Sequence, residues 1–319
     1  MRKVVVTDST FPTLEYEQAV ALRHQGQFNA HQCRTSAEVT EAVKGAAAVF
    51  VQFAPLQEEA INGLAPGATI VRYGVGFDNV NVAAALAGGH RVCYVPDYCT
   101  DEVADHTVAL LLAGLRKIPQ LDASVRQGQW KAVAISAPLK PFDLSTIGFV
   151  GLGRIGRSVL HRIRNFGFDM VVSDPMMTDE QAVALNVRRV STDELLTSSD
   201  AVLLHVPSTS QTRGMINRQS ISSMRDGALI VNCSRGDLID ENDLAAALTA
   251  GKVRAALDVF GHEPLVETSP LRSAPNLILT PHAAWYSDRA IGRLQELASD
   301  EVDRGLSGKP ARCPVPFTA

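Results

Sequence analysis

The stretch Thr146-Ile-Gly-Phe-Val-Gly151-Leu-Gly153-Arg-Ile-Gly156 is an apolar run that ends in three glycines spaced G-x-G-x-x-G. Gly151 permits a tight turn from a strand into a helix, Gly153 removes the Cβ that would obstruct a pyrophosphate, and Gly156 lets the helix pack closely on a sheet. Free N–H groups at the start of that helix face the phosphate charge. The spacing therefore predicts a strand, a phosphate-binding turn and a helix that hold a dinucleotide.

An acidic residue, Asp174, follows the next apolar run of the chain. Its carboxylate can accept hydrogen bonds from both hydroxyls of an adenosine ribose, and it repels a 2′-phosphate. An ordinary glycine turn has no need of an acid at this position. The combination therefore favours a nucleotide site, with NAD rather than NADP as the cofactor.

Short β-branched runs alternate with helical patterns along the whole chain. The runs predict strands at residues 4–7, 48–52, 69–72, 146–150, 170–173, 201–205, 229–232, 254–258 and 277–280. The helical patterns predict helices at residues 37–43, 80–87, 100–115, 154–165, 240–250 and 288–306. Continuous apolar strands joined by helices indicate parallel sheets that are covered on both faces.

The glycine motif lies in mid-chain, whereas the alternation begins near residue 4, so another αβ unit precedes the cofactor domain. The last helix has no sheet of its own and is expected to return to that first unit. We therefore predict an α/β fold with two Rossmann-like, doubly wound parallel sheets. The smaller, flavodoxin-like domain is discontinuous, with residues 1–98 plus 285–319, and binds the substrate. The NAD-binding Rossmann domain spans residues 99–284.

Composition narrows the function classes. The chain has 319 residues and a formal charge of −4, which gives no reason to expect nucleic acid as a partner. Its five scattered cysteines form no C-x-x-C pair, which argues for reduced thiols in a cytoplasm and against a disulfide or metal framework. The longest apolar helix pattern is too short to span a membrane. We expect a cytoplasmic protein with no metal site and no membrane partner.

Charged residues follow several of the predicted strands, where ligands gather in open α/β sheets. Arg235 stands at such a strand end, where a guanidinium can grip a carboxylate in a fork that lysine cannot match, although an isolated arginine is more often a solvated surface charge. Two glycines flank Val75, which frees backbone N–H groups to point at an anion beside Arg72. The alternative interpretation of the residues around Val75 is a plain glycine turn.

His282 is the best candidate for acid–base chemistry among the eight histidines. A lone histidine is usually structural, but this one follows a strand and a proline and has Glu263 available upstream. A carboxylate within hydrogen-bond reach would fix the imidazole tautomer and favour its protonated form. His282 would then suit the delivery of a proton to a carbonyl oxygen. His205 and His262 are weaker candidates, the first as part of a cofactor loop and the second as a surface residue.

Five motifs occur in the order that is typical of the D-isomer-specific 2-hydroxyacid dehydrogenases. They are Gly74-Val-Gly-x-Asp-Asn, Gly151-x-Gly-x-x-Gly with Asp174, Asn232-x-x-Arg235-Gly, Asp258-x-x-x-x-Glu263-Pro and Pro281-His282. The chain resembles that family from about residue 45 to about residue 310. Residues 71–79 and 282–287 are most similar to its C-terminal-binding-protein branch, which contains bacterial dehydrogenase-like proteins and animal transcriptional corepressors.

The resemblance implies a D-2-hydroxyacid dehydrogenase that moves a hydride between a nicotinamide ring and C2 of a small 2-oxo or 2-hydroxy acid. Arg235 would bind the carboxylate of the acid and polarise its ketone. His282 would be the general acid and base, paired with Glu263. The resemblance also implies a homodimer that forms through the cofactor domain, with a helical arm near residues 100–115.

Two further sets of residues follow from the resemblance. The substrate would be bound by Arg72, Val75, Gly76 and Trp285. The cofactor would be held by Gly151, Gly153, Arg154, Ile155, Gly156, Asp174, His205, Val206, Pro207, Thr212, Cys233, Ser234, Asp258 and Ala284. In this second set, Asp258 would accept from the nicotinamide carboxamide and so orient the ring.

Two other functions remain open at this point. One is an NAD(H)-sensing scaffold or corepressor-like protein with vestigial activity, which the Trp285 motif and Arg72 favour. The sequence lacks the tails rich in proline, serine or charge that recruit partners, which speaks against it. The other is oxidation of phosphite or formate on the same scaffold, which the pairing of Glu263 with His282 suits less well than a carboxylate-bearing ketone.

Overall fold

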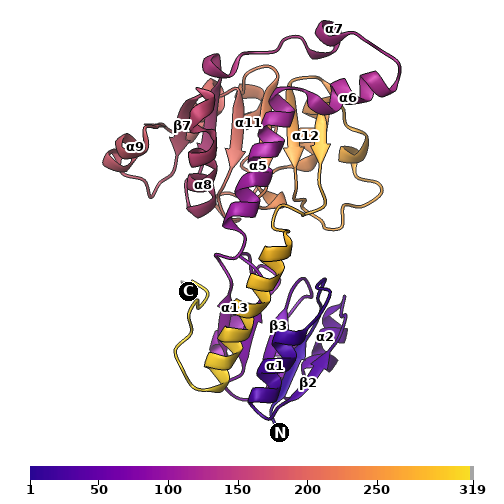
Figure 1. The fold of residues 1–319 in the computed structure, drawn as a ribbon, viewed down its shortest axis with the longest axis vertical. Helices are drawn as coiled ribbons and strands as arrows, with labels where there is room; N and C mark the ends of the chain where they lie inside the picture. Colours follow the sequence, from indigo (N-terminus) through magenta and orange to yellow (C-terminus); the bar gives the residue numbers. More distant parts are fainter. Residues whose placement is uncertain (317–319) are drawn as a thin grey trace. The chain divides into compact units, whose positions relative to one another are not determined.

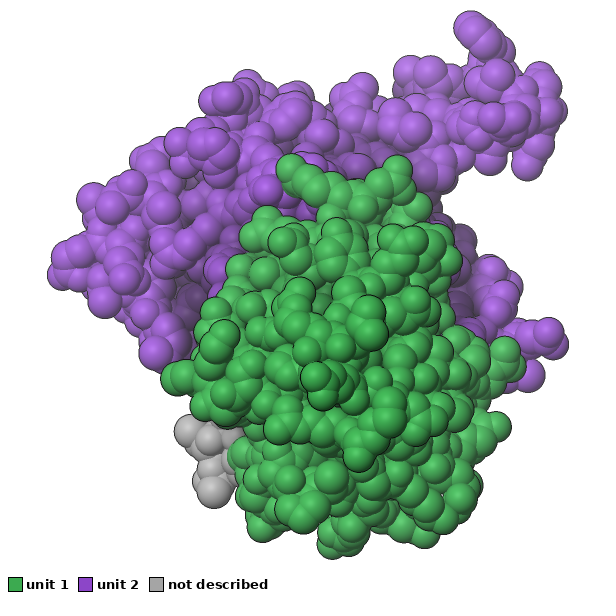
Figure 2. Space-filling view, turned by 60° about the horizontal axis from the view of Figure 1, so that its bottom comes forward, with its two compact units in different colours: residues 1–99, 286–319 green, residues 100–285 purple. Residues whose placement is uncertain are grey.

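The computed structural model describes residues 1–316, and the chain forms two compact units that are coloured separately in Figure 2. The first unit comprises residues 1–99 and the segment that begins at Tyr286, and the second comprises Thr100–Trp285. Each unit is built around one parallel sheet. The predicted α/β fold with two Rossmann-like sheets is confirmed, including the discontinuity of the smaller unit. In the described part of the chain, no helix combines the length and the apolar character needed to cross a membrane.

The first unit contains a five-stranded sheet in the order β2-β1-β3-β4-β5, which is the flavodoxin-like order. Its strands are β1 (Lys3–Val6), β2 (Gln27–Ala30), β3 (Ala46–Val51), β4 (Thr69–Arg72) and β5 (Arg91–Tyr94). Its helices are α1 (Glu15–Arg23), α2 (Ser36–Val43), α3 (Glu58–Asn62), α4 (Val82–Ala87) and α13 (Asp288–Leu306). Helix α13 lies beside α1 and packs on the central strands, so the C-terminal helix returns to this unit as the sequence predicts (Figure 1).

A buried polar cluster joins α1, β4 and α13 within the first unit. The hydroxyl of Tyr73, which directly follows β4, donates to Oε1 of Glu17 over 2.6 Å. The Gln295 amide of α13 donates to both oxygens of the same carboxylate, at 3.3 and 3.2 Å. Burial raises the pKa of Glu17, and the hydrogen bonds from Tyr73 and Gln295 oppose that rise. The cluster satisfies the polar groups that α1 and α13 bury against the sheet.

The second unit contains a seven-stranded sheet in the order β12-β11-β10-β9-β6-β7-β8. Counted from β6, this is the dinucleotide-binding order 3-2-1-4-5-6 with one further strand at the edge. The strands are β6 (Thr146–Val150), β7 (Asp169–Ser173), β8 (Arg188–Arg189), β9 (Ala201–Leu204), β10 (Ala228–Asn232), β11 (Val253–Leu257) and β12 (Leu277–Leu279). All of these pairings are parallel, so the carboxyl ends of the strands meet at one edge of the sheet.

Helices cover both faces of the second sheet. Neighbouring residues of a strand point to opposite faces, so the buried strands contribute apolar side chains to both. Val171 and Val172, for example, belong to two different apolar clusters, one on each side. Helices α5 and α8 pack side by side on one face, with α5 crossing in front of the sheet in Figure 1. The helices of this unit are α5 (Thr100–Leu115), α6 (Ile118–Arg126), α7 (Ala132–Ser136), α8 (Arg154–Ile163), α9 (Asp179–Leu185), α10 (Thr192–Ser198), α11 (Arg218–Ser223) and α12 (Glu241–Thr249).

Candidate active site

The glycine turn of the second unit has the shape that a dinucleotide requires. Gly151 has φ +82°, and a Cβ there would lie 2.7 Å from the carbonyl oxygen of His205. A Cβ on Gly156 would lie 3.1 Å from the Gly151 oxygen. Beside Gly153, in contrast, the described residues other than its chain neighbours leave the position of a Cβ clear to 4 Å. Two glycines thus close the turn on the protein, and the third leaves space for a pyrophosphate.

Helix α8 begins directly at this turn, with Gly153 as its N-cap and no side-chain cap. The first N–H groups of a helix have no partner inside the helix, so those of Arg154, Ile155 and Gly156 are available to phosphate oxygens. The turn lies where the strand order reverses, between β6 and β9. The residues present therefore fit a dinucleotide at the switch point of the sheet.

Asp174 follows β7 and is held by two backbone N–H groups. Its Oδ2 accepts from Leu152 N and its Oδ1 from Met176 N, each over 2.8 Å. A carboxylate oxygen can accept more than one hydrogen bond, so both oxygens can also receive a ribose hydroxyl. The bond to Leu152 ties Asp174 to the glycine turn, which fixes it beside the expected position of the adenosine.

The loop after β9 contains the predicted cofactor residues His205, Val206, Pro207 and Thr212. The His205 ring stacks on Phe149 at 6.2 Å between centroids, and burial lowers its pKa to about 4. It is therefore neutral near pH 7 and unsuited to proton delivery. The hydroxyl of Thr212 donates to the Pro207 carbonyl over 2.6 Å, which closes the loop on itself. These contacts agree with a loop that shapes a binding site and takes no part in acid–base chemistry.

The turn after β10 is pinned by the side chains around it. Asn232 accepts from Ser234 N over 3.0 Å and donates to the Arg235 carbonyl over 2.7 Å. The Ser234 hydroxyl donates to the Leu204 carbonyl over 2.6 Å, which joins this turn to the end of β9. Burial raises the pKa of Cys233 to about 12, so its thiol is not a nucleophile at neutral pH.

Gly236 brings this turn against the loop that follows β11. A Cβ on Gly236 would lie 1.8 Å from the carbonyl carbon of Phe260, so only glycine permits the approach. The Phe260 N–H in turn donates to Oε1 of Glu263 over 2.9 Å. Arg235, whose Nη1 donates to the Ser234 carbonyl over 2.6 Å, is close enough for its charge to act on Glu263. The structure thus brings Arg235 and Glu263 together from two loops.

His282 and Glu263 form a direct pair, with 2.6 Å between Nδ1 and Oε2. Burial would raise the pKa of Glu263, but the hydrogen bond and charge of His282, the Phe260 N–H and the charge of Arg235 together lower it. An ionised Glu263 accepts from Nδ1–H, so the pair fixes the orientation of the imidazole ring. Each side chain is 31% exposed, so a ligand can reach the pair.

Asp258 lies at the end of β11 and is fully buried. Its Oδ1 accepts from the Thr280 hydroxyl over 2.6 Å and from Ala283 N over 2.9 Å. Its Oδ2 accepts from Ala284 N over 2.9 Å. A carboxylate has about four acceptor positions. One position on Oδ2 therefore remains for a ligand donor such as a carboxamide N–H.

His282 itself has an unusual backbone conformation, with φ +52°. For a residue with a side chain, the left-handed region costs about 1–2 kcal/mol. The His282 N–H donates to the Asp258 carbonyl over 2.8 Å and to the Thr280 carbonyl over 3.1 Å. These bonds hold the turn that directs the imidazole toward Glu263.

The predicted substrate residues lie in both units, and each is described within its own. In the first unit, Nη1 of Arg72 donates to the Tyr73 carbonyl over 2.7 Å. Gly74 has φ +133°, and a Cβ there would collide with the Arg72 guanidinium. Val75 and Gly76 follow at intermediate exposure, and Trp285 is the last residue of the second unit. The substrate-binding roles of these residues stay predictions.

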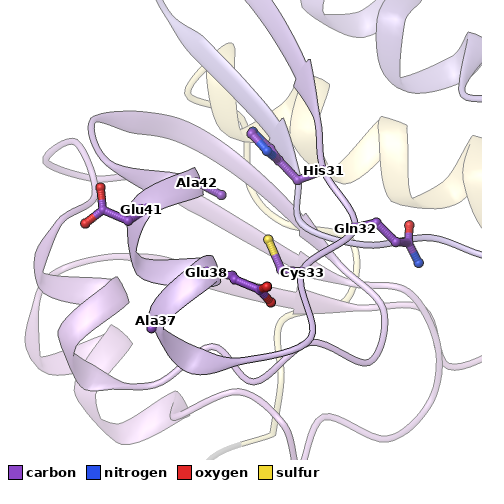
Figure 3. A pocket seen from close by; sticks show the side chains of 7 residues that line it. All are labelled: His31, Gln32, Cys33, Ala37, Glu38, Glu41 and Ala42. Carbon is purple, nitrogen blue, oxygen red and sulfur yellow. The ribbon is translucent and has the colours of Figure 1, made fainter.

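A surface hollow on the first unit contains none of the predicted site residues. It is lined by His31, Gln32, Cys33, Ala37, Glu38, Glu41 and Ala42 (Figure 3). Glu38 serves the local fold, because its Oε2 accepts from Arg34 N and Thr35 N at the start of α2. Among residues 1–316, no group of three or more His, Cys, Asp or Glu side chains is arranged to hold a metal ion.

Two residues that the sequence did not single out as site residues join the site. His106 on α5 lies 3.0 Å from the Thr280 hydroxyl, measured from Nε2, and that hydroxyl contacts Asp258. Thr280 directly follows β12, and a position at the end of a strand could have marked it as a site residue. His106 lies far away in sequence inside a helix that packs on the sheet, and only the fold brings it here.

Comparisons with known proteins agree with this geometry. The family model for the NAD-binding domain of the D-isomer specific 2-hydroxyacid dehydrogenases matches residues 108–284. The chain is 40% identical to D-3-phosphoglycerate dehydrogenase of Mycobacterium tuberculosis, with 84% of this chain and 51% of that protein covered. It is 36% identical to D-3-phosphoglycerate dehydrogenase of Methanocaldococcus jannaschii, with 98% and 59% covered.

A solved structure of D-lactate dehydrogenase from Aquifex aeolicus, complexed with NAD and lactic acid, matches with a TM-score of 0.85 and 27% identity over 96% of each chain. The protein therefore belongs to the D-isomer specific 2-hydroxyacid dehydrogenase family, and its cofactor is NAD. The chain spans 51% to 59% of the length of the curated relatives named above.

Proposed function

We propose that the protein is an NAD-dependent D-2-hydroxyacid dehydrogenase that also catalyses the reverse reduction of a 2-oxo acid. The observation that carries this proposal is the contact of 2.6 Å between His282 and Glu263, with Arg235 beside it. All three residues follow strands whose carboxyl ends lie at the same sheet edge as the glycine turn. These positions suit a proton donor, its acidic partner and a carboxylate-binding cation in the same unit as the glycine turn.

Each of these side chains has a defined chemical task. NAD(H), held by the glycine turn and Asp174, would supply the hydride for reduction at C2 of the 2-oxo acid. His282 Nε2 gives its proton to the ketone oxygen, while Glu263 holds Nδ1–H and stabilises the imidazolium. Arg235 binds the carboxylate and stabilises the negative charge that develops on the oxygen. In the oxidation of a hydroxy acid, neutral His282 takes the proton back.

The identity of the acid is a separate proposal. We expect a small 2-oxo acid. Within the first unit we propose Arg72, Val75 and Gly76 for substrate binding, and within the second unit we propose Trp285. The curated relatives are named for 3-phosphoglycerate, which adds that hydroxy acid and its 2-oxo counterpart to the candidates. The corepressor-like alternative predicts NADH binding with at most vestigial turnover of any such acid.

A panel of 2-oxo acids tests this proposal directly. NADH consumption is followed with glyoxylate, hydroxypyruvate, its 3-phosphate, pyruvate, and branched and aromatic 2-oxo acids. We expect saturable consumption with at least one of them. Tight NADH binding with no consumption would support the sensing protein instead, and NAD reduction by phosphite or formate alone would support the third function.

Glu263→Gln is expected to move the alkaline limb of the pH–rate profile for 2-oxo acid reduction to lower pH. Although burial opposes it, the protonated His282 lowers the pKa of Glu263, and by reciprocity the ionised Glu263 stabilises the imidazolium. The glutamine amide has no charge, so it holds the ring without stabilising its protonated form. Steady-state rates across neutral pH measure the shift, and an unmoved limb would remove Glu263 from the mechanism.

We further propose that the protein is a homodimer, formed through the segment that joins α5 to β6. Helix α5 is packed on its own sheet, whereas this segment exposes Trp130 at 89%, Val133 at 77% and Ile118 at 53%. Figure 1 places α7 of this segment away from the sheet. A second copy of the chain would bury these side chains. Sedimentation velocity that finds only a monomer would contradict this proposal.

The state of the cysteines supports a proposal about the cellular compartment. Each of the five cysteines is a thiol outside any disulfide, and Cys33, Cys93 and Cys99 are buried. Buried thiols agree with a reducing compartment, so we propose the cytoplasm.

A further inference from the structure

We propose that Thr280 and His106 are positioning residues for His282, because a chain of hydrogen bonds from His106 through Thr280 to Asp258 holds the turn that carries the imidazole. The proposal rests on the proposed function in one respect only, namely that His282 delivers the proton. The chain of hydrogen bonds is a property of the second unit and can be measured without turnover.

The turn around His282 is anchored on Asp258 from both sides. The His282 N–H donates to the Asp258 carbonyl over 2.8 Å. The next two N–H groups, of Ala283 and Ala284, donate to the two carboxylate oxygens of Asp258 over 2.9 Å each. A side chain with φ +52° keeps that conformation only when its surroundings determine it. The position of the Asp258 carboxylate therefore sets the position of the imidazole.

The carboxylate of Asp258 is in turn held by Thr280. The 2.6 Å contact between Thr280 Oγ1 and Asp258 Oδ1 uses the single hydroxyl proton, because a carboxylate only accepts. Thr280 must then accept in its contact of 3.0 Å with His106 Nε2. His106 is therefore the donor, which assigns its proton to Nε2. The two hydrogen bonds therefore run in one direction, from His106 through Thr280 to the carboxylate of Asp258.

His106 connects these hydrogen bonds to a rigid helix. It lies on α5, a helix of 16 residues whose neighbouring residues Ala104 and Thr107 are buried and which packs on β10 and β11. Its side chain is 25% exposed, and its Nε2 lies 3.6 Å from Asp258 Oδ1. Helix α5 thus fixes His106 at one end of this series of hydrogen bonds, and the turn with His282 lies at the other end. The Thr280 carbonyl also accepts from the His282 N–H, but substitutions of the side chain leave that carbonyl in place, so the effect of the Thr280 hydroxyl and of His106 on His282 passes through Asp258.

Two matched pairs of variants test the proposal in the full-length protein. Thr280→Val keeps the shape of the side chain and removes the hydroxyl, whereas Thr280→Ser keeps the hydroxyl. His106→Leu removes the donor, whereas the amide nitrogen of His106→Gln can donate from a position near that of Nε2. A displacement of about 1 Å at a reacting group can cost about a hundredfold in rate. We expect Thr280→Val and His106→Leu to lower kcat by about 10- to 100-fold.

The control variants and NADH binding separate positioning from general damage. Thr280→Ser and His106→Gln are expected to keep kcat within about threefold of the unaltered protein, because the hydrogen bonds remain. The dissociation constant for NADH, from fluorescence titration, is expected to change by a smaller factor than kcat for all four, because the glycine turn and Asp174 keep their contacts and only the carboxamide contact proposed for Asp258 is affected. Equal kcat values within each pair would overturn the proposal. If Thr280→Val does not fold, the pair at the partly exposed His106 decides by the same criterion.

Nitrogen-15 NMR of the histidine rings gives a test that needs no turnover. We expect the His106 ring to carry its proton on Nε2 in the unaltered protein, and a mixture of tautomers in Thr280→Val. A dominant Nδ1–H form in the unaltered protein would overturn the hydrogen-bond chain. Absence of activity toward every 2-oxo acid would refute the proposed function, while the ring nitrogens would still decide the structural part of the inference.

Discussion

His282→Gln is expected to lower turnover by about 10²- to 10⁴-fold, which corresponds to about 2.7–5.4 kcal/mol in the barrier. Glutamine can donate a hydrogen bond but cannot give up a proton at neutral pH, so the ketone oxygen loses its acid. The dissociation constant for NADH is expected to stay the same, since the glycine turn and Asp174 are separate from His282. Steady-state kinetics and NADH fluorescence measure the two quantities on the same preparation.

His262 offers a matched control for this variant. It lies on the same loop as Glu263, is exposed, and its Nδ1 is 3.2 Å from the Pro264 carbonyl. His262→Gln makes the same chemical change one residue from the acidic partner of His282. We expect it to retain normal turnover. Full turnover in His282→Gln, or an equal loss in both variants, would refute the role of His282 as the acid.

Arg235→Lys is expected to lower kcat/KM by about 10²-fold, or about 2.7 kcal/mol, although the charge is kept. A guanidinium binds a carboxylate through two parallel hydrogen bonds, and an ammonium cannot reproduce that fork. The Arg235 carbonyl is fixed by the Asn232 amide and its Nη1 by the Ser234 carbonyl, so the side chain is oriented before substrate arrives. We expect KM to rise and kcat to fall, because the same group also stabilises the developing oxyanion.

An exposed arginine provides the comparison for this change. Arg218 on α11 is 85% exposed and pairs with Asp243. Surface pairs of this kind contribute little, so Arg218→Lys is expected to leave both kinetic constants unchanged. An Arg235→Lys variant with normal kcat/KM for every accepted 2-oxo acid would show that another group binds the carboxylate.

The sequence predicted the parts of the fold that depend on apolar patterns. The strand before Gly151 and the helix after it appear as β6 and α8, because β6 is buried along its whole length and α8 buries one apolar side, including Val159, Leu160 and Ile163. Strand β2, with the sequence Gln-Phe-Asn-Ala, was missed. It lies at the edge of the first sheet and is exposed at both of its ends, so no apolar periodicity marks it.

The predicted strands were too long at the positions where the site lies. The predictions included His205, Asp258 and Thr280, whereas β9, β11 and β12 each end one residue earlier. The N–H groups of these residues still donate to the neighbouring strands, at Val150, Asn232 and Leu257 respectively, but the strands themselves end before them. A pattern of hydrophobicity cannot locate that end, since Asp258 is as buried as the strand before it.

The sequence identified Arg235, Glu263 and His282 as catalytic candidates, but it did not show which contacts bring their loops together. Gly236 supplies part of the answer, because its missing Cβ allows the loops after β10 and β11 to touch. The contribution of His106 could not be seen from the chain, because a histidine inside an amphipathic helix has no local signal of function. Only the packing of α5 on the sheet brings it to Thr280.

The most direct test of the central claim is chiral analysis of the product that forms as NADH is consumed. The purified protein is incubated with NADH and the best 2-oxo acid of the panel, alongside His282→Gln. We predict one D-2-hydroxy acid for each NADH oxidised by the unaltered protein, and formation at least about 10²-fold slower with the variant. An L-hydroxy acid, or NADH that stays bound and unoxidised with every acid, would contradict the account.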